Sequence, residues 1–470
     1  MGFIEQLKGL FAVSLNTRAQ KEFDVKPLES LPFASYITKC AGIYAGRPYW
    51  VDREAGIKTV NMARTICSEI ARLTVLGVEI TVDGSGRGEY LQVQVDDLKS
   101  RIRAWVEFAC AYGTIILKPN GEDVDLCLPD DFAVVAQKNG RITGAVFRTR
   151  RKSPDGKKTY IRLEKHAFTD EGYTVENKAF VSEGDNDDAG RPIPLTESPW
   201  KDLEEMTVLD IDRPLFAVLK MPQANNVDLQ SPLGVPIFGD AIEELRDLDI
   251  AYSMNAREIE DSGRIVLMDS DRLIPTKGSA TNADAWAKGR ERLKLPRYVQ
   301  NIMGSGEGDI YHEINPALNT PTRIAGIDYL LSQIGYKCGF SNGYFVFDQK
   351  SGMVTATQVE SDDRRTIQLI RDVRDQLEAC INDLVYALNV FADLEGLPMG
   401  EYEVTYNMQD LTANHEEDKL RWWGYVAQGK IPAWYFFNKF EGLSEDEAKA
   451  LVEEAQPPMA PGLLEGGLEE

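Results

Sequence analysis

Several segments of the chain carry apolar residues at the spacing of an amphipathic helix. Residues 55–75 predict one helix, with Val60 at the start of its apolar stripe. Residues 92–110 predict a second helix. Residues 357–391 predict a much longer one, because apolar side chains return every three or four positions over several turns. The chain is therefore expected to contain a substantial helical framework.

Two further helices bracket a compact segment. Residues 236–261 predict a helix that would span about 39 Å. Residues 321–338 predict its counterpart, which starts with Pro as helices often do. Between them, residues 262–320 are rich in Gly, Pro and short strand-like pieces. One face of the first helix carries Ile237, Ala241, Leu245, Leu248 and Tyr252. A helix pair cannot cover itself on all sides, so this layout favours copies packed side by side in a ring.

Residues 114–180 have the pattern of short alternating strands separated by turns. The turn sequences PNGED, QKNGR, SPDGK and TDEG predict four hairpins, because Asn-Gly and Asp-Gly favour tight turns. The segment also carries a basic stretch, which would be either a nucleic-acid patch or a solvated hairpin face. Only Tyr160 is interleaved as a stacking platform, which favours the solvated face. The basic residues are Arg141, Arg148, Arg150, Arg151, Lys152, Lys157, Lys158, Arg162 and Lys165.

The remaining segments are less regular. Residues 183–212 are acidic and rich in Pro, which predicts a loop. Near the C-terminus, the sequence EYEVTYN predicts a strand, and an aromatic-rich helix follows it. Ser444 and Glu447 form a capping box at the start of a short last helix. Residues 453–470 have the composition of a flexible tail.

Composition narrows the class of protein. The chain has 470 residues, 43% of them hydrophobic, which is enough for several structural modules. Its 52 Lys and Arg stand against 75 Asp and Glu, giving a net charge of −23. Tight binding to phosphates requires clustered Lys and Arg, so such a chain would surround nucleic acid rather than grip it. The acidity equally fits plain solubility.

The cysteines and the N-terminus exclude further classes. The six cysteines are scattered without CxxC spacing, which indicates reduced thiols of an intracellular protein rather than a disulfide framework. Residues 1–15 predict a short amphipathic helix rather than a signal peptide. No apolar run approaches the roughly 20 residues of a membrane span, so no membrane is expected.

The sequence motifs typical of catalytic or metal-binding sites are either missing or stand in the wrong structural context. The chain lacks GxxxxGK[ST] and is therefore no P-loop motor. His166, His312 and His415 lie far apart, so no metal site is expected. The sequence Gly339-Phe340-Ser341-Asn342-Gly343 matches GxSxG, but a helix precedes Ser341 and a strand-like stretch follows, the reverse of a nucleophile elbow. The chain is expected to be no enzyme and to need no cofactor.

Several short motifs, taken in order, resemble those of the portal proteins of tailed double-stranded-DNA bacteriophages. Ile43-Tyr44-Ala45-Gly46 with Trp50 resembles the family's IYxGxxxW start, and residues 61–73 resemble the helix after it. The sequence AYGTIILKP resembles the start of the wing sheet, and residues 231–253 resemble the first stem helix. Thr355-Ala356-Thr357-Gln358-Val359 with Ser361 resembles TATEVxS, and QGKIP with SEDEAKALVEE resembles the C-terminal region. Each motif is short, and their order over nearly the whole chain carries the resemblance.

The resemblance implies an α+β portal fold assembled as a ring, usually of twelve copies, at one capsid vertex. The parts would be the wing (1–235, with the β-rich insert 114–180, and the long helix and return strand 357–411), the stem helices (236–261 and 321–340), the clip (262–320), the tunnel loop (341–356), a small helical crown (412–452) and a flexible tail (453–470). The short C-terminus departs from the family and implies a small crown.

The resemblance also implies roles for individual residues. The loop would line the channel and face DNA through Lys337, Ser341, Asn342, Gly343, Tyr344, Lys350, Ser351 and Gly352. Lys337 and Lys350 would make brief phosphate contacts, or be ordinary surface lysines. The clip would dock the terminase through Asp269, Asp271, Arg272, Lys277, Arg290, Arg292, Lys294 and Arg297. The stem would pack through Ile237, Leu245, Leu248, Tyr252, Ile327 and Leu331.

The implied function is a channel for DNA packaging and ejection in the virion, made in the host bacterial cytoplasm. The implied partners are further copies of the chain, double-stranded DNA, the large terminase subunit, the major capsid and scaffold proteins and a head-completion or adaptor protein. Two alternatives stay open. One is another capsid-associated ring or scaffold protein, and the other is a serine hydrolase that uses Ser341.

Overall fold

The computed structural model describes residues 15–121, 123–183, 190–261, 265–269, 299–302, 311–314, 319–346, 356–394, 396, 400–408, 415–441 and 443–455. The chain divides into two compact units, Met1–Met408 and Gln409–Glu470. Helices and sheets both contribute, so the fold is α+β as predicted. Across the described ranges, no helix combines the length and apolar character needed to cross a bilayer.

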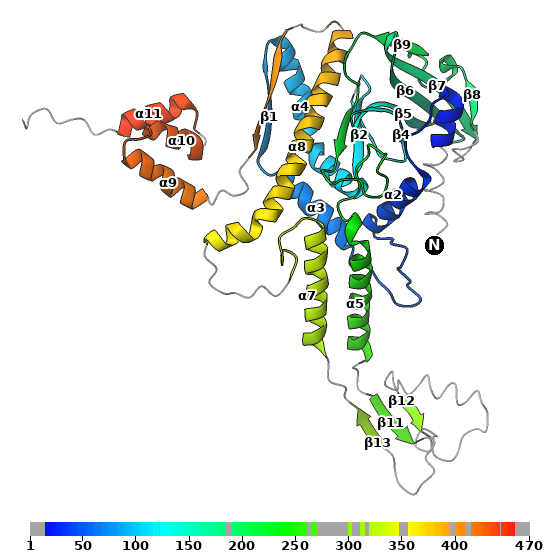
Figure 1. The fold of residues 1–470 in the computed structure, drawn as a ribbon, viewed down its shortest axis with the longest axis vertical. Helices are drawn as coiled ribbons and strands as arrows, with labels where there is room; N and C mark the ends of the chain where they lie inside the picture. The colour runs from blue at the N-terminus through cyan, green and yellow to red at the C-terminus, as the bar shows by residue number, and fades with distance from the viewer. Residues whose placement is uncertain are drawn as a thin grey trace, which may run out of the picture. The chain divides into compact units, whose positions relative to one another are not determined.

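Four helices frame the first unit: α2 (Leu31–Tyr44), α3 (Met62–Thr74), α4 (Gly86–Tyr112) and α8 (Ala356–Leu394). The 39-residue helix α8 packs against both α3 and α4 (Figure 1). Its buried residues include Ile370, Val373, Leu377 and Leu384, which keep the predicted helical spacing. The periodicity of the sequence therefore identified the longest helix correctly.

Two helix starts differ from the prediction. Helix α3 begins at Met62 rather than at residue 55, because Asn61 adopts a left-handed conformation with φ of 56°. Val60 therefore lies outside the helix and is 41% exposed. Helix α4 begins earlier than predicted, at Gly86, although the glycines around it indicate a turn. A Cβ at Gly88 would come within 2.8 Å of the Asp83 carbonyl oxygen, so the first turn of α4 needs glycine there.

A six-stranded antiparallel sheet forms the β-rich part of the first unit. Its order is β4-β5-β6-β7-β8, with β9 also paired to β7. All four predicted hairpins connect neighbouring strands: β2 (Thr114–Pro119) to β3 (Val124–Cys127), β4 to β5, β5 to β6 and β6 to β7. The strands are β4 (Phe132–Lys138), β5 (Arg141–Lys152), β6 (Lys158–Thr169), β7 (Gly172–Glu183), β8 (Arg191–Ile193) and β9 (Met206–Leu209). Residues 183–212 were predicted as a loop, but the described part of this segment supplies two short strands, β8 and β9.

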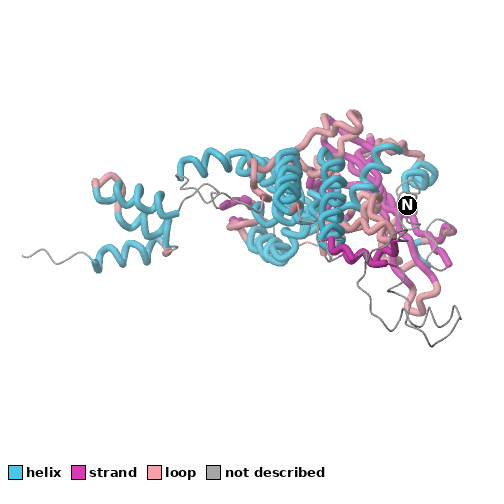
Figure 2. Tube along the Cα trace, turned by 90° about the horizontal axis from the view of Figure 1, so that it is seen from below, coloured by secondary structure: helices cyan, strands magenta, loops and turns pink. Residues whose placement is uncertain are grey.

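The large sheet is covered on both faces. Residues 15–23 form a helix whose Leu15, Ala19 and Phe23 pack on Ile161 and Phe180. On another face, α2 and a small sheet enclose an apolar core with aromatic residues from several elements. In Figure 2 many of the strands, drawn in magenta, gather in the part of the first unit near the N label, with helices beside them. This part of the chain is a closed core.

Two small sheets join distant parts of the sequence. One has the order β10-β2-β3 and contains β2 (Thr114–Pro119), β3 (Val124–Cys127) and β10 (Ala217–Lys220). Every residue of β2 is buried. The other pairs β1 (Val78–Gly84) with β14 (Tyr402–Met408) in antiparallel register, and β14 confirms the strand predicted from EYEVTYN. These pairings tie residues 400–408 to the N-terminal half.

The helix pair predicted around residues 262–320 is present. Helix α5 (Ile242–Asp261) follows a short 3-10 turn, η2 (Gly239–Ala241), so it has 20 residues and a length of about 30 Å, shorter than predicted. Helix α7 (Thr320–Lys337) has Pro in its first turn, as predicted. Between them, β11 (Ile265–Asp269) pairs with β12 (Val299–Ile302) and β13 (Tyr311–Ile314).

The second unit consists of short helices in its described ranges. They are α9 (His415–Ala427), α10 (Ala433–Glu441) and α11 (Glu445–Ala455). The predicted capping box is present, because the Ser444 backbone N–H donates to the Glu447 carboxylate at 3.0 Å and the Glu447 N–H donates back to Ser444 Oγ at 3.3 Å. Helix α11 extends three residues beyond the predicted end of this region.

Candidate channel stem and loop

Helices α5 and α7, which we call the stem, pack side by side and run antiparallel (Figure 1). Two ion pairs fix this direction. Glu244 pairs with Lys337 at 2.6 Å, and Glu258 pairs with Arg323. The partners are 14 residues apart on each helix, which corresponds to about 21 Å along the axis. The pairs therefore tie both ends of the stem.

The predicted stem residues fall into two groups. Ile237, Leu245, Leu248 and Leu331 are buried, and Ile327 is half-buried. Tyr252, which the spacing places on the same apolar face, is 44% exposed. The periodicity identified the apolar face, but the rest of the first unit covers that face only near the start of α5.

Further apolar side chains are exposed along the stem. Ile259 is 57% exposed, and it lies on the same side of α5 as Tyr252 because seven residues separate them. Helix α7 contributes Ile324 and Tyr329, which are 43% and 64% exposed. Met254 and Tyr336 belong to the same set. The stem thus presents apolar surface that a single copy of the chain leaves in water.

The segment after α7, residues 339–346, forms what we call the loop root. Gly339 adopts φ of 93° and turns the chain over Leu369 of α8. The Ser341 backbone N–H donates to Thr366 Oγ1 at 2.8 Å, and the two hydroxyl oxygens lie 3.0 Å apart. Phe340 is fully buried beside them. The loop root is therefore fixed to α8.

Ser341 itself is in the interior, contrary to its predicted position facing DNA. It is 4% exposed, and its hydroxyl also accepts from the Thr366 backbone N–H at 3.3 Å. A nucleophilic serine needs an accessible hydroxyl beside a general base. The hydroxyl of Ser341 is engaged by Thr366, so the geometry contradicts the hydrolase alternative.

Tyr344 is tied to α3. Its hydroxyl donates to the carboxylate of Glu69, which Arg72 also holds through two hydrogen bonds of 2.7 and 2.9 Å. Burial, followed by the Glu69 carboxylate, raises the pKa of Tyr344 to about 12. Its ring packs against Phe340 and Phe345. Tyr344 therefore attaches the loop root to the framework, and no sequence motif indicated this partner.

The other predicted loop residues differ in position. Lys337 donates to Glu244 and to the Asp240 carbonyl oxygen at 3.0 Å, so its charge serves the stem rather than a phosphate. Asn342 is exposed, and Gly343 adopts φ of 82° in open space. Three loop predictions, Lys350, Ser351 and Gly352, lie outside the described residues.

Most of the predicted clip residues also lie outside the described ranges. These are Asp271, Arg272, Lys277, Arg290, Arg292, Lys294 and Arg297. Asp269 is the last residue of β11, the central strand of the small inserted sheet. The terminase-docking role of all eight stays a prediction.

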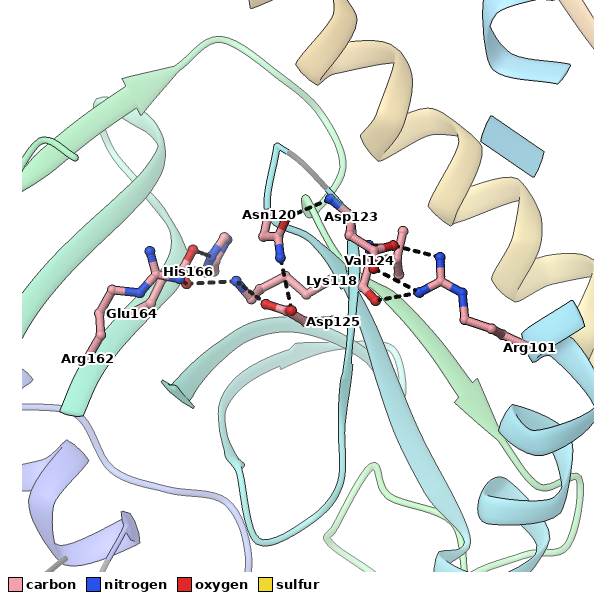
Figure 3. A network of polar contacts seen from close by, with 9 residues as sticks. All are labelled: Arg101, Lys118, Asn120, Asp123, Val124, Asp125, Arg162, Glu164 and His166. Carbon is pink, nitrogen blue, oxygen red and sulfur yellow. Dashed lines mark hydrogen bonds and ion pairs between the residues drawn. The ribbon is translucent and has the colours of Figure 1, made fainter. Parts of the chain in front are cut away.

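The basic stretch predicted as a solvated face is partly inside the protein. Arg148 and Arg162 are each 7% exposed. Arg162 and Lys118 both donate to Glu164 at 2.8 Å, and Glu164 Oε1 lies 2.9 Å from His166 (Figure 3). Figure 3 also shows Lys118 reaching from β2 toward this cluster. Two of the nine basic residues, Arg148 and Arg162, therefore have structural roles. The charge of a residue does not show whether sheet pairing will bury it.

His166 is buried in this cluster, and its surroundings shift its pKa downward. Burial is the largest influence and lowers its pKa, although the nearby Glu164 opposes this. Burial alone would raise the pKa of Glu164, but Lys118, His166 and Arg162 bring it well below its ordinary value. Within the described ranges, no cluster of His, Cys, Asp or Glu has the grouping of a metal site.

Comparison with known proteins gives similarity only at the level of structure. No protein-family model and no curated protein matches the sequence. The chain is similar to a chain from the neck of an empty gene transfer agent particle, with 13% identity, a TM-score of 0.40 and coverage of 87% of this chain and 95% of that one. A chain from the virion of a native gene transfer agent particle gives 12% identity, a TM-score of 0.40 and coverage of 87% and 99%. A TM-score of 0.40 is too low to establish a shared fold.

Proposed function

We propose that this chain is a portal subunit of a tailed bacteriophage, a structural head-to-tail protein that forms a ring around the path of double-stranded DNA. The observation that carries the proposal is the stem. Two antiparallel helices are joined by an inserted small sheet, and both helices expose apolar side chains. The order of the sequence motifs along the chain supports the same function.

The exposed stem residues favour a ring of identical copies. Burying apolar surface stabilises by roughly 25 cal/mol per Å², so each exposed Tyr or Ile on the stem is a source of binding energy. Tyr252 and Ile259 lie on one side of α5, whereas Tyr329 lies on α7. A head-to-tail arrangement brings one side of each copy against another side of its neighbour, and it forms a ring when the rotation between neighbours closes.

The net negative charge of the chain fits a channel through which DNA passes better than a site that binds DNA tightly. A net charge of −23 opposes tight binding to phosphates, and a channel must let DNA slide. Lys337 is engaged by Glu244, which removes one of the two predicted phosphate contacts. Residues 347–355 and the exposed Asn342 are the parts of the loop that we propose to line the channel.

The partners follow from the proposed position in the particle. The sheet between the stem helices would dock the large terminase subunit during packaging and a head-completion protein afterwards. The capsid and scaffold proteins would contact the first unit. The ring would stand at one vertex of the virion, usually with twelve copies.

Electron microscopy of the purified full-length chain in negative stain tests the proposal. Rings with a central hole of DNA width are the expected result. Ile259→Asp should abolish the rings, because it places a charge on the exposed apolar side of α5. Val93→Asp is the matched control, since Val93 is a 65% exposed apolar residue on α4, outside the stem. A closed dimer without a channel would overturn the proposal. It would also exclude the alternative that the chain is a different ring-forming capsid protein.

A further inference from the structure

Residues 50–60, which we call the strap, run along α5. Both carboxylate oxygens of Asp249 accept hydrogen bonds from it. The Trp50 indole N–H donates to Oδ2 at 2.8 Å, and the Val60 backbone N–H donates to Oδ1 at 2.8 Å. Asp249 is 4% exposed, so these bonds are shielded from water. One carboxylate of the stem thus ties together both ends of the strap.

Two more contacts continue along the same stripe of α5. The Lys58 backbone N–H donates to Ser253 Oγ at 2.9 Å, and the Arg257 guanidinium donates to the Ala55 carbonyl oxygen. Asp249, Ser253 and Arg257 are four residues apart, so they lie on one side of the helix. The strap therefore follows α5 for about 12 Å.

The strap has an internal order of its own. Asp52 Oδ1 accepts from the backbone N–H groups of Glu54 at 2.9 Å and Ala55 at 3.0 Å. The Ile57 N–H donates to the Asp52 carbonyl oxygen at 2.7 Å. Gly56 adopts φ of 72°, and a Cβ there would come within 2.9 Å of the Arg257 guanidinium. A segment with these bonds can act as a fixed support.

Helix α7 holds α5 from another side. Glu244 and Glu258, which pair with α7, lie well away from Asp249 around the helix at 100° per residue. The strap and α7 thus grip α5 from two directions. The position of α5 relative to α3 is fixed as well, because the strap leads directly into α3 at Met62.

We infer that the strap sets the direction of the stem and thereby the number of copies in the ring. This inference rests on the proposed function. Neighbours in a closed ring are rotated by about 30° for twelve copies and about 28° for thirteen. A change of roughly 2° in how the stem meets its neighbour therefore changes the closure. The buried carboxylate of Asp249 holds that angle in every copy.

Variants of the full-length chain test the inference. Asp249→Asn replaces one acceptor with an amide N–H that faces the donor of Val60 or Trp50. Ser253→Ala is milder and removes the acceptor of Lys58. Lys58→Ala is the matched control, because the backbone of Lys58 makes the contact with Ser253. Native mass spectrometry gives the copy number, amide exchange at Val60 reports the strap, and circular dichroism reports folding.

The wild type and Lys58→Ala should give one dominant copy number. Asp249→Asn should spread the rings over two or more copy numbers or open arcs, while exchange at Val60 rises about tenfold or more. If Asp249→Asn fails to fold, the same spread in Ser253→Ala decides the question. An unchanged copy number despite faster exchange would overturn the inference and leave the portal proposal intact. Absence of rings in the wild type would instead overturn the proposed function itself.

Discussion

The large sheet and the stem distribute polar and apolar side chains in opposite ways. In and beside the sheet, Lys118, Arg162 and Glu164 are buried and paired with one another. On the stem, Tyr252 and Ile259 are 44% and 57% exposed. Buried charges that pair with one another are satisfied within a single chain. Exposed apolar side chains are removed from water only when another surface covers them. Folding of one chain is enough to satisfy the buried groups of the sheet, and we propose that the exposed apolar side chains of the stem are covered only on assembly.

The largest effect is expected from breaking the buried cluster. Glu164→Gln removes the carboxylate that Lys118 and Arg162 share in Figure 3, and Lys118 keeps only its longer pair with Asp125, at 3.8 Å, among its ion pairs in the described residues. Two buried cations would then lose their shared partner, so the free energy of unfolding should fall by about 3–5 kcal/mol. Denaturant unfolding followed by circular dichroism measures this change.

Lys99→Ala is the control for that variant. Lys99 pairs with Asp96 at 2.7 Å, but the two side chains are 47% and 51% exposed. Water competes for such a pair, so its loss should change the free energy of unfolding by less than about 1 kcal/mol. Equal effects of the two variants would contradict the view that burial makes the sheet cluster essential.

A smaller loss is expected at the loop root, where the stem meets the framework. Thr366→Val keeps the shape of the side chain but removes the acceptor of the buried Ser341 N–H. An unsatisfied buried N–H costs about 1–3 kcal/mol, and amide exchange at Ser341 should become faster. Thr322→Val, on the exposed first turn of α7, should stay within about 0.5 kcal/mol of the wild type. If Thr366→Val left both the free energy of unfolding and the exchange at Ser341 unchanged, the loop root would be held by Phe340 and Tyr344 without Thr366.

The sequence predicted elements whose period is long and regular. Helix α8, the four hairpins and the stem pair all follow from apolar spacing or turn residues. The predicted start of α3 at residue 55 was wrong. The apolar pattern begins before Met62, in residues of the strap that contact α5 instead of forming a helix. Local periodicity cannot show that a segment is held by a helix nearly 200 residues away.

The candidate site was less predictable for the same reason. Ser341 follows a glycine in a loop-like sequence, which favours exposure, yet its partner Thr366 lies 25 residues further along. Lys337 and Glu244 are 93 residues apart, so no local pattern indicates that this lysine forms an ion pair. Trp50 belongs to the IYxGxxxW-like motif, but only the structure identifies Asp249 as the residue to which its indole N–H donates.

A pH dependence of about one proton is expected from the sheet cluster. Burial holds the pKa of His166 below its ordinary value of 6.5, so below that pH the unfolded chain binds more protons at this residue than the folded chain does. Stability should therefore fall as the pH drops from about 6.5, by at most about 1.4 kcal/mol per pH unit. The difference in unfolding free energy between the wild type and His166→Gln, measured from pH 7.5 to pH 5, isolates this contribution. A difference that grows in favour of the wild type on acidification would mean that His166 is charged in the fold.

The smallest effect on the single chain is expected on the stem, and it sharpens the comparison most. Tyr329 is 64% exposed, so Tyr329→Ser removes little that folding has buried and should change the free energy of unfolding by less than about 0.5 kcal/mol. The same variant should lower the assembled fraction, because the lost ring is surface that we propose a neighbouring copy covers. Unfolding under conditions that keep the chain monomeric, together with the assembled fraction from native mass spectrometry, separates the two effects. A loss of monomer stability without a change in assembly would mean that this face of α7 belongs to the chain's own core, and the contrast between a sheet completed by folding and a stem completed by assembly would fail at its most exposed residue.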